Sequence, residues 1–413
     1  MPHPTPEYKV RKHIESTLLK NKTYNEILTF TGAGCWPHYV PAACDEINSR
    51  SEFLTAYTGD VYSDLGRYQA LYEFQSMIGG LVSMDVVTFP VYDWATAAGD
   101  TVRMATTITG RREILCPKII NPERLSVMKN YSNRLADINL VDYEPETGLI
   151  DLQDLKKKIS SKTAGVYIEN PTYMGFIETE CEEIGEIAHN HGALFMVGVE
   201  PLSLGILTPP GEYGADIVCG EGQPLGIHMY FGGALLGFIA FRDDEKFVSA
   251  TGHRMITVTK NEDNGEWGFA YVLPKRTMFA AREKAITITG TSTVLWAITA
   301  AVYMSLLGPK GIEELAKVVM YKSNYAMKRL SEISHIKAPL FESPHFKEFT
   351  VNFETRKTIQ QVNNALLKHG IQGGKNITTE FSELKNIALY CITELHTKED
   401  IDRLALALDE VVK

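Results

Sequence analysis

The sequence has few cysteines and none of the paired motifs that would organise a fold around them. Its six cysteines are scattered over 413 residues: Cys35, Cys44, Cys116, Cys181, Cys219 and Cys391. There is no C-x-x-C pair, and scattered thiols are typical of reduced, cytosolic proteins rather than of a disulfide framework. Cys35, His38 and Cys44 have the residue types of a zinc site, but no fourth ligand follows at a recognisable spacing. We therefore expect no metal.

The sequence also lacks the features of a nucleic-acid or membrane protein. Its formal net charge is -10 and it has no dense run of Lys or Arg, so nothing favours nucleic acid or an anionic membrane surface. The first residues, MPHPTPEYKVRKHIEST, contain no apolar core of a signal peptide. The longest apolar runs, residues 226–241 and 294–307, are shorter than the roughly 20 residues of a membrane span. We expect a cytoplasmic protein that contacts neither nucleic acid nor membrane.

What the sequence does contain is a regular alternation of strand-like and helix-like segments. The expected strands cover residues 86–89, 113–116, 138–142, 165–169 and 194–199, and the expected helices between them cover 93–108, 122–131, 151–160 and 178–191. Strands separated by helices favour right-handed crossovers and a mostly parallel sheet that is covered on both faces. The sequence therefore predicts an α/β fold, with a large domain over residues 65–310.

Two further units flank this domain. Residues 1–64 are expected to form an N-terminal helical arm, and residues 311–413 a small C-terminal α+β domain. Within the large domain, residues 253–277 predict a hairpin with its tip at the polar NEDNGE stretch.

Polar residues follow two of the apolar strands and predict a pocket. Glu200 ends the run ALFMVGVEP, while Glu221 and Gln223 lie in GADIVCGEGQPLG. The carboxyl ends of strands in a doubly wound sheet form the usual ligand crevice. A buried Glu200 without a partner would have a raised pKa, so we expect Lys, Arg, water or the backbone N–H groups of the following turn beside it.

The turn after residues 86–89 reads PVYDWATAAGD and has an unusual chemistry for its position. A phosphate bound at a helix N-terminus needs free N–H groups and small side chains. Asp93 is typical of a helix cap, and the indole of Trp94 is bulky. Both residues disfavour a bound phosphate.

Several motifs together resemble one family. They are TGAGCWPHYVP, SEFLTAYT, ALYEFQSMIGGL, YDWATAA, GADIVCGEGQPLGIHMYFGGALLGF, REKA followed by AAVYMSLLGPKGI, and the closing TELHTKEDIDRLALAL. The sequence is similar over nearly its whole length to the subunit 1 members of the glycine-cleavage P-protein family, glycine dehydrogenase (decarboxylating).

The resemblance implies a fold and a partnership. The fold is that of aspartate aminotransferase (pyridoxal-phosphate fold type I), with a mostly parallel seven-stranded sheet. The family forms a heterotetramer with two copies of each subunit, in which subunit 2 carries the lysine and the pyridoxal phosphate. Glycine loses its carboxylate there, and the aminomethyl group passes to the lipoyl arm of the H-protein. Subunit 1 shapes the site without binding the cofactor.

The resemblance places Gln223 at the position of the Schiff-base lysine. An amide cannot form the imine that covalent catalysis needs, so we expect no catalytic residue in this chain. The residues that we expect to line the site are His38, Tyr39, Tyr57, Thr58, Glu200, Glu221 and Gln223.

Three departures from the family pattern leave alternatives open. Tyr57 and Thr58 run into GDVYSDLG instead of the usual Y-T-P-Y-Q loop ending in S-Q-G, Trp94 replaces a small residue, and Glu200 replaces a shorter one. One alternative is a catalytically silent or regulatory homologue, or a divergent paralogue that pairs with a pyridoxal-phosphate subunit for another amino acid. Another is a free-standing enzyme in which Lys260 or Lys284 reaches the cofactor.

Overall fold

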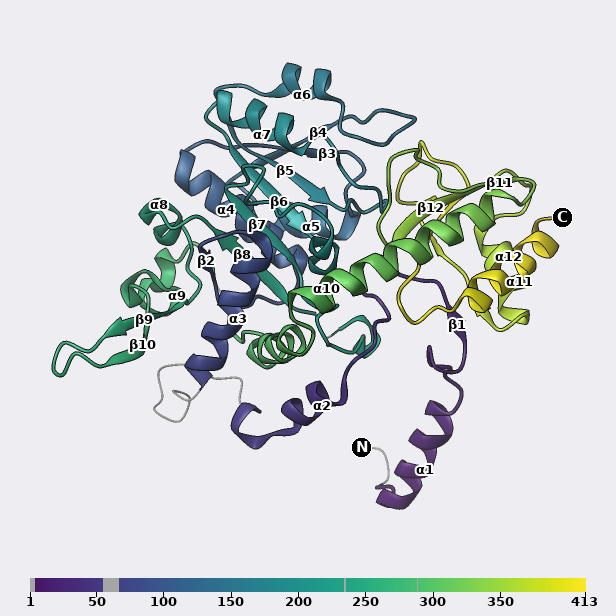
Figure 1. Ribbon diagram of the computed structural model, residues 1–413, viewed down its shortest axis with the longest axis horizontal. Helices are drawn as coiled ribbons and strands as arrows, with labels where there is room; N and C mark the ends of the chain where they lie inside the picture. The colour runs from purple at the N-terminus through teal and green to yellow at the C-terminus, as the bar shows by residue number, and fades with distance from the viewer. Residues whose placement is uncertain (1–3, 55–66, 234, 288) are drawn as a thin grey trace.

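A seven-stranded sheet forms the centre of the larger part of the chain (Figure 1). The computed structural model describes residues 4–54, 67–233, 235–287 and 289–413. The strands lie in the order β2 (Val86–Val87), β8 (Gly237–Phe241), β7 (Ile217–Glu221), β6 (Leu194–Val199), β5 (Thr163–Asn170), β3 (Glu113–Pro117) and β4 (Asp137–Val141). The pairs from β7 to β4 are parallel, and β8 is antiparallel to both of its neighbours. The predicted mostly parallel seven-stranded sheet is confirmed.

The helices of this part begin and end where local signals place them. They are α3 (Arg67–Val82), α4 (Trp94–Thr109), α5 (Pro122–Tyr131), α6 (Leu152–Lys158), α7 (Cys181–Asn190), α8 (Glu245–Ser249) and α9 (Met278–Ala281). The side chains of Asp93, Asn121 and Asp151 accept backbone N–H bonds at the starts of α4, α5 and α6. Gly110, with φ 67°, ends α4 in the left-handed conformation that glycine adopts without strain.

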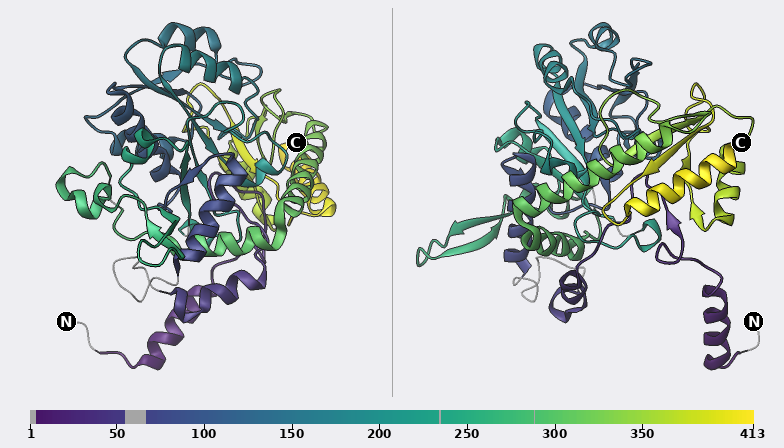
Figure 2. Two further views of the ribbon diagram at one scale, coloured as in Figure 1. Left: turned by 60° about the vertical axis from the view of Figure 1, so that its left-hand side comes forward. Right: turned by 45° about the vertical axis from the view of Figure 1, so that its right-hand side comes forward.

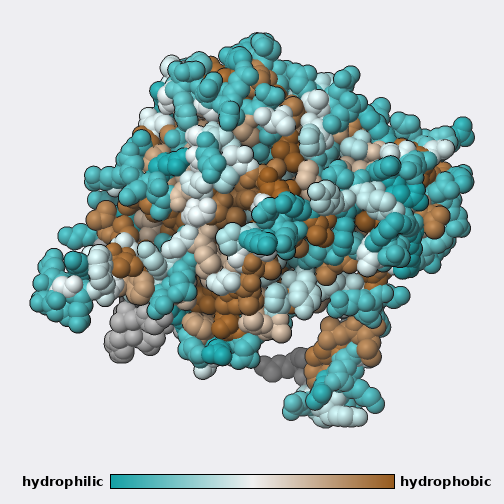
Figure 3. Space-filling model, viewed as in Figure 1, coloured by the Kyte–Doolittle hydropathy of each residue, from teal (hydrophilic) through white to brown (hydrophobic). Residues whose placement is uncertain are grey.

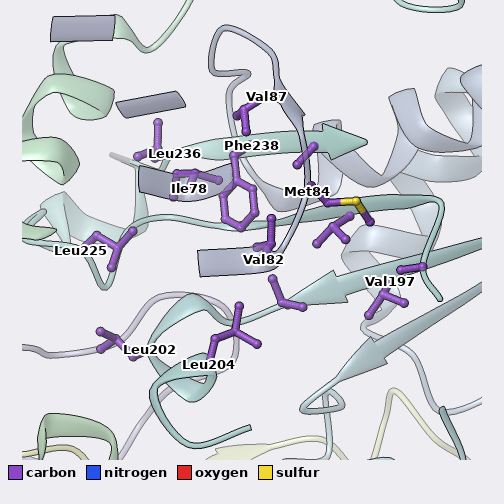
Figure 4. Close-up of a cluster of buried hydrophobic side chains, with 14 of the residues drawn as sticks. Ile78, Val82, Met84, Val87, Val197, Leu202, Leu204, Leu225, Leu236 and Phe238 are labelled. Atoms are coloured by element: carbon purple, nitrogen blue, oxygen red, sulfur yellow. The ribbon is translucent and has the colours of Figure 1, made fainter. Parts of the chain in front are cut away.

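Both faces of the sheet are buried, because successive residues of a strand point to opposite sides. Val166 and Val197 belong to one core, with α3, α7 and the start of α10, whereas Tyr167 and Met196 belong to another that includes α4. Figure 4 shows part of the first core, in which Ile78 and Val82 of α3 lie beside Phe238 of β8. The loops at the ends of the strands therefore extend from a sheet whose two faces are both covered.

The carboxy-terminal part is a four-stranded sheet covered by helices. The strands lie in the order β11 (Ile336–Lys337), β12 (Glu348–Phe353), β15 (Ile387–Cys391) and β14 (Lys375–Asn376), and all pairs are antiparallel. The helices are α11 (Ile359–Lys368) and α12 (Lys398–Val412), and each begins with a capping box. A separate core contains Phe349, Val351 and Leu404.

The amino-terminal segment begins with a helix that projects from the body (Figure 2), and its later residues, such as Phe30 and Trp36, are buried in the cores. It contains α1 (Glu7–Leu18), β1 (Leu28–Thr29), α2 (Ala42–Ser49) and the 3-10 turn η1 (Ser51–Phe53). β1 pairs in parallel with β13 (Ile371–Gln372) of the carboxy-terminal part. Within the expected helical arm, residues 28–29 are a strand and not a helix, since the N–H groups of Leu28 and Phe30 donate to the carbonyls of Gly370 and Gln372. The division into an arm and two domains stays a prediction.

One long helix joins the two parts. α10 (Val294–Ser331) is continuous apart from Gly308, whose φ 60° and ψ 178° break the helical path before Pro309. It is the one helix among the described residues that is long and apolar enough to cross a membrane by length and composition. Buried residues from both of its halves, such as Ile298 and Leu330, pack into the cores of the two parts. The helix therefore contributes to the cores of both parts.

Shorter elements complete the chain. They are η3 (Pro201–Gly205), η4 (Tyr230–Gly232), β9 (Ile256–Lys260), β10 (Trp267–Tyr271), η5 (Pro274–Arg276) and η6 (Arg282–Lys284). β9 and β10 pair with each other in antiparallel fashion and form the predicted hairpin.

Candidate functional site

Gln223 lies in the loop after β7 and is fully engaged with its own chain. Its Oε1 accepts a hydrogen bond from the N–H of Trp36 at 3.0 Å, and its Nε2 donates to the carbonyls of Trp36 at 3.1 Å and Ile227 at 2.8 Å. The side chain is buried. Both amide hydrogens are therefore used, and the residue clamps the amino-terminal segment to the sheet.

Glu221, the last residue of β7, occupies the place where a helix N-terminus could hold an anion. Its Oε2 accepts the N–H of Trp94 at 3.2 Å, and its Oε1 accepts those of Gln223 and Leu236 at 3.0 and 2.7 Å. Burial raises the pKa of Glu221 to about 7, although these three N–H bonds lower it. The carboxylate thus takes the first helical N–H of α4 that a phosphate would need.

Asp93 takes a second N–H of the same turn. Its Oδ1 accepts from Thr96 at 2.6 Å, as the cap prediction requires. With Glu221 and Asp93 both in place, the start of α4 already carries two carboxylates, which complement the positive end of the helix dipole. A further anion there would face their repulsion.

Trp94 fills the space beside the strands. Its indole Nε1 donates to the hydroxyl of Tyr167 at 3.0 Å, and the guanidinium of Arg124 lies 3.9 Å from the ring centre. A Cβ placed on Gly198 of β6 would lie 2.7 Å from the indole nitrogen, so the ring packs directly against the sheet. Arg124 is held by a two-pronged pair with Glu169 at 2.6 and 2.7 Å.

Glu200 directly follows β6 and has both kinds of partner that the sequence predicts. It accepts the N–H groups of Leu202 and Ser203 at 3.3 and 3.0 Å, which caps η3. Its Oε1 also lies 3.1 Å from the ammonium of Lys347, in a buried ion pair. The charge of Glu200 is thereby compensated within the chain.

His38 continues this buried chain of polar groups. Its Nε2 lies 3.1 Å from the Lys347 ammonium, and its Nδ1 lies 2.7 Å from Oε2 of Glu394. Burial alone would raise the pKa of Glu394, but its contacts with His38 and with the N–H of Tyr39 lower it to about 2. His38 thus joins the amino-terminal segment to the carboxy-terminal sheet.

These side chains leave almost no room between them. The cavity beside Glu200 is bounded by Trp36, Trp94, Arg124, Glu200, Lys347 and Glu348, and its volume is about 20 Å³. A volume of that size holds about one water molecule. That is far smaller than a substituted pyridine ring with a phosphate.

The residues predicted to line a site have different environments. His38, Glu200, Glu221 and Gln223 are buried and hydrogen-bonded, whereas the side chain of Tyr39 is 62% exposed. Tyr57 and Thr58 lie outside the described residues. Among these five residues that the structure describes, Tyr39 alone presents a ring to the surface.

Two lysines considered from the sequence do not line this cavity. Lys260 lies on the β9–β10 hairpin with its ammonium 5.2 Å from the ring of Trp267, and Lys284 is exposed in η6. Lys347 does line the cavity, and sequence reasoning missed it. Its one signal is a charge inside the apolar run HFKEFTVNF, where an inward-facing cation needs a buried anion.

Cys35 and His38, two of the residues considered for a zinc site, have separate partners. Cys35 lies 3.7 Å from the carbonyl of Met229, and His38 is bound to Glu394 and Lys347. In the part of the chain that the structure describes, no three His, Cys, Asp or Glu side chains are grouped as a metal would require.

The comparisons with known proteins agree with this geometry. The family model of the glycine cleavage system P-protein matches residues 1–408. The probable glycine dehydrogenase (decarboxylating) subunit 1 of Staphylothermus marinus is 42% identical over 413 residues, which cover 99% of this chain and 87% of the relative. The protein of the same name from Pyrococcus furiosus is 41% identical over 416 residues, which cover 100% of this chain and 91% of the relative.

Solved structures give the same result. An inhibitor-bound glycine decarboxylase (P-protein) of the glycine cleavage system superposes with a TM-score of 0.90 and 33% identity, covering 100% of this chain and 91% of its own. A sphingosine-1-phosphate lyase from Burkholderia pseudomallei has a TM-score of 0.71 at 14% identity, covering 100% and 92% of the two chains. At that identity the lyase shares the fold alone.

Proposed function

This chain belongs to the glycine cleavage system P-protein family, and from that membership we propose that it is the lysine-less subunit 1 of a pyridoxal-phosphate-dependent glycine decarboxylase. The family and the fold imply dependence on pyridoxal phosphate, and the name of the relatives implies a second subunit. The finer assignment places the cofactor on that lysine-bearing subunit 2. The observation that carries it is Gln223, whose amide is bonded to Trp36 and Ile227 where a lysine would be needed.

The packing around Gln223 also supports placing the cofactor on subunit 2. Trp94, Glu221 and the Glu200–Lys347 pair fill the volume and use the N–H groups that a cofactor would occupy. Burying a phosphate beside Asp93 and Glu221 would bring like charges together in a poorly solvated place, which is strongly unfavourable. The cofactor therefore belongs to the partner, in a heterotetramer with two copies of each subunit.

The role left to this chain is to form a wall of the partner's site. Gln223, Glu348 and Glu394 hold the segment from Ala33 to Tyr39 through its backbone, with N···O distances of 2.6 Å for Ala33 and Tyr39. A backbone fixed at several points presents the exposed ring of Tyr39 in a defined position. The substrate is glycine, and the lipoyl arm of the H-protein receives its aminomethyl group. The six free thiols are in keeping with a cytoplasmic location.

A glycine–bicarbonate exchange assay tests this function. Each chain alone, the co-expressed pair, and the pair with H-protein are incubated with glycine, pyridoxal phosphate and labelled bicarbonate. We expect label in glycine only when both chains and H-protein are present. A pair that assembles and never exchanges label, or exchange by this chain alone, would contradict the proposal.

The silent homologue and the paralogue for another amino acid are not favoured. Their support is the altered sequence after Thr58, which lies outside the described residues, together with Trp94 and Glu200. Trp94 and Glu200 are accounted for by the packing of a chain that holds no cofactor. Relatives at about 40% identity over the whole chain are named as subunits of the enzyme.

A further inference from the structure

The β9–β10 hairpin projects from the body of the molecule as an ordered arm (Figures 1 and 2). Its register pairs Trp267 with Lys260 and Tyr271 with Ile256. The connecting loop is closed by a bond from the N–H of Asn261 to the carbonyl of Glu266 at 2.8 Å. No third strand adds to it within the described residues. A two-stranded ribbon is marginal in water, so its stability depends on what covers its faces.

The two faces of the hairpin differ in chemistry. Alternation along the strands places Ile256, Val258, Lys260, Trp267, Phe269 and Tyr271 on one side. The other side carries Thr257, Thr259, Gly268 and Ala270. One face is therefore mainly aromatic and apolar, with the cation Lys260 at its outer end, while its reverse carries small side chains.

Among the described residues, α3 packs against the apolar face near its base. Tyr271 lies against Tyr68 of α3 with ring centres 5.1 Å apart, and Phe269 lies 5.6 Å from Tyr72. Trp267 is one pair further out and is 68% exposed, with the ammonium of Lys260 5.2 Å from its ring. The aromatic face thus continues past the surface that packs against it.

The tip of the hairpin is acidic. It carries Glu262, Asp263 and Glu266, and none of the three forms an ion pair within the described part of the chain. Its far end, at the lower left of Figure 3, is hydrophilic. A second copy of this chain, with a formal net charge of -10, would approach against repulsion, whereas a surface with Lys or Arg would be attracted.

We propose that the β9–β10 hairpin docks this chain onto the lysine-bearing subunit 2, with Trp267 buried in an apolar strip of that subunit and basic residues opposite the acidic tip. The proposal rests on the proposed function, because a chain without a cofactor site must remain bound to the chain that has one. Such a stable interface buries about 800 Å² on each partner. A tryptophan near its centre is the residue type that contributes most to affinity.

Substitution of the outermost aromatic residue tests the docking. Trp267→Ser removes a side chain that is 68% exposed, and a far-UV spectrum and thermal unfolding of the isolated chain confirm that the fold is unchanged. The matched control is Tyr321→Ser, on the second half of α10, where the ring is also exposed. We expect Trp267→Ser to raise the dissociation constant for subunit 2 by about 30-fold or more, and Tyr321→Ser to raise it by less than about 3-fold.

A charge reversal tests the second element of the proposal. Glu262→Lys with Asp263→Lys should slow association with subunit 2, and the difference from the native chain should shrink at high salt. Equal affinity of native and Trp267→Ser chains would overturn the docking site while leaving the proposed function intact. Failure of the native chain to bind subunit 2 would overturn both. Trp267-dependent self-association, or Trp267-dependent binding to H-protein alone, would replace the proposed occupant.

Discussion

The ammonium of Lys347 lies 3.1 Å from the carboxylate of Glu200, although 147 positions separate them in the chain. Glu200 directly follows a strand of the large sheet, and Lys347 directly precedes β12 of the small one. The same ammonium lies 3.1 Å from His38 and 3.7 Å from the ring centre of Trp36. One buried cation therefore joins three segments of the chain.

Lys347→Met should destabilise the protein by about 3–5 kcal/mol, since it leaves a buried carboxylate and a buried imidazole without their donor. The free energy of unfolding in urea measures this loss. Lys310→Met, at an exposed position of α10, is the control and should change stability by less than about 0.5 kcal/mol. Adding Glu200→Gln to Lys347→Met should recover part of the loss, because the uncompensated charge is then gone. A loss below about 1 kcal/mol in the single variant would show that the pair is not buried as described.

Glu394 should make the protein less stable in acid. Its pKa in the folded chain is lowered to about 2 from the ordinary 4.5, so its contribution is present above pH 4.5 and is lost as the pH falls toward 2. The shift corresponds to at most about 3 kcal/mol. We expect the stability difference between the native chain and Glu394→Gln to shrink between pH 5 and pH 3 by an amount of that order. A difference that is constant with pH would contradict the paired state of Glu394.

Glu221, in contrast to Glu394, should make the protein more stable in acid than at neutral pH. Burial raises its folded pKa to about 7 from 4.5, so the folded chain holds the proton more tightly than the unfolded chain does. Its protonation stabilises the fold at low pH, and this contribution is lost as the pH rises from 4.5 through 7. Unfolding of native and Glu221→Gln chains across this range should show the native chain losing stability relative to the variant. A relative gain would mean that the three N–H bonds outweigh burial.

Trp94→Ala should cost about 3–5 kcal/mol, because it opens a cavity between α4 and the sheet and removes the ring beneath Arg124. Trp267→Ala provides the matched control, since the same side chain is lost from an exposed position, and its cost should be below about 0.5 kcal/mol. Urea unfolding of the isolated chain measures both. Equal losses of stability in the two variants would contradict the close packing of Trp94 between α4 and the sheet.

Much of the fold was predictable because its signals are local. Asp93, Asn121 and Asp151 begin helices by bonding to backbone groups two or three residues away, and alternating strands and helices predict the parallel sheet. The pairing of β1 with β13 was not predictable, since its partners lie more than 340 positions apart and each strand has two residues. Propensity cannot detect a strand that short.

The sequence indicates which polar residues belong to the site, but not the partners with which they form ion pairs and hydrogen bonds. Burial of Glu200 after a strand requires a compensating group, but nothing near it in sequence indicates that Lys347 supplies the charge. The absence of lysine at Gln223 is visible in the sequence, whereas two of the three hydrogen bonds that fix its amide are made with Trp36 and depend on the path of residues 31–40. Chemistry that depends on long-range contacts becomes apparent only once the chain is folded.

The central claim is that the cofactor is held by the partner subunit and not by this chain. Borohydride reduction of the co-purified pair, saturated with pyridoxal phosphate, followed by mass analysis of each chain, tests it most directly. We expect the reduced cofactor on a lysine of subunit 2 only, with this chain unmodified. A cofactor adduct on this chain, at Lys347 or any other lysine, would contradict the account.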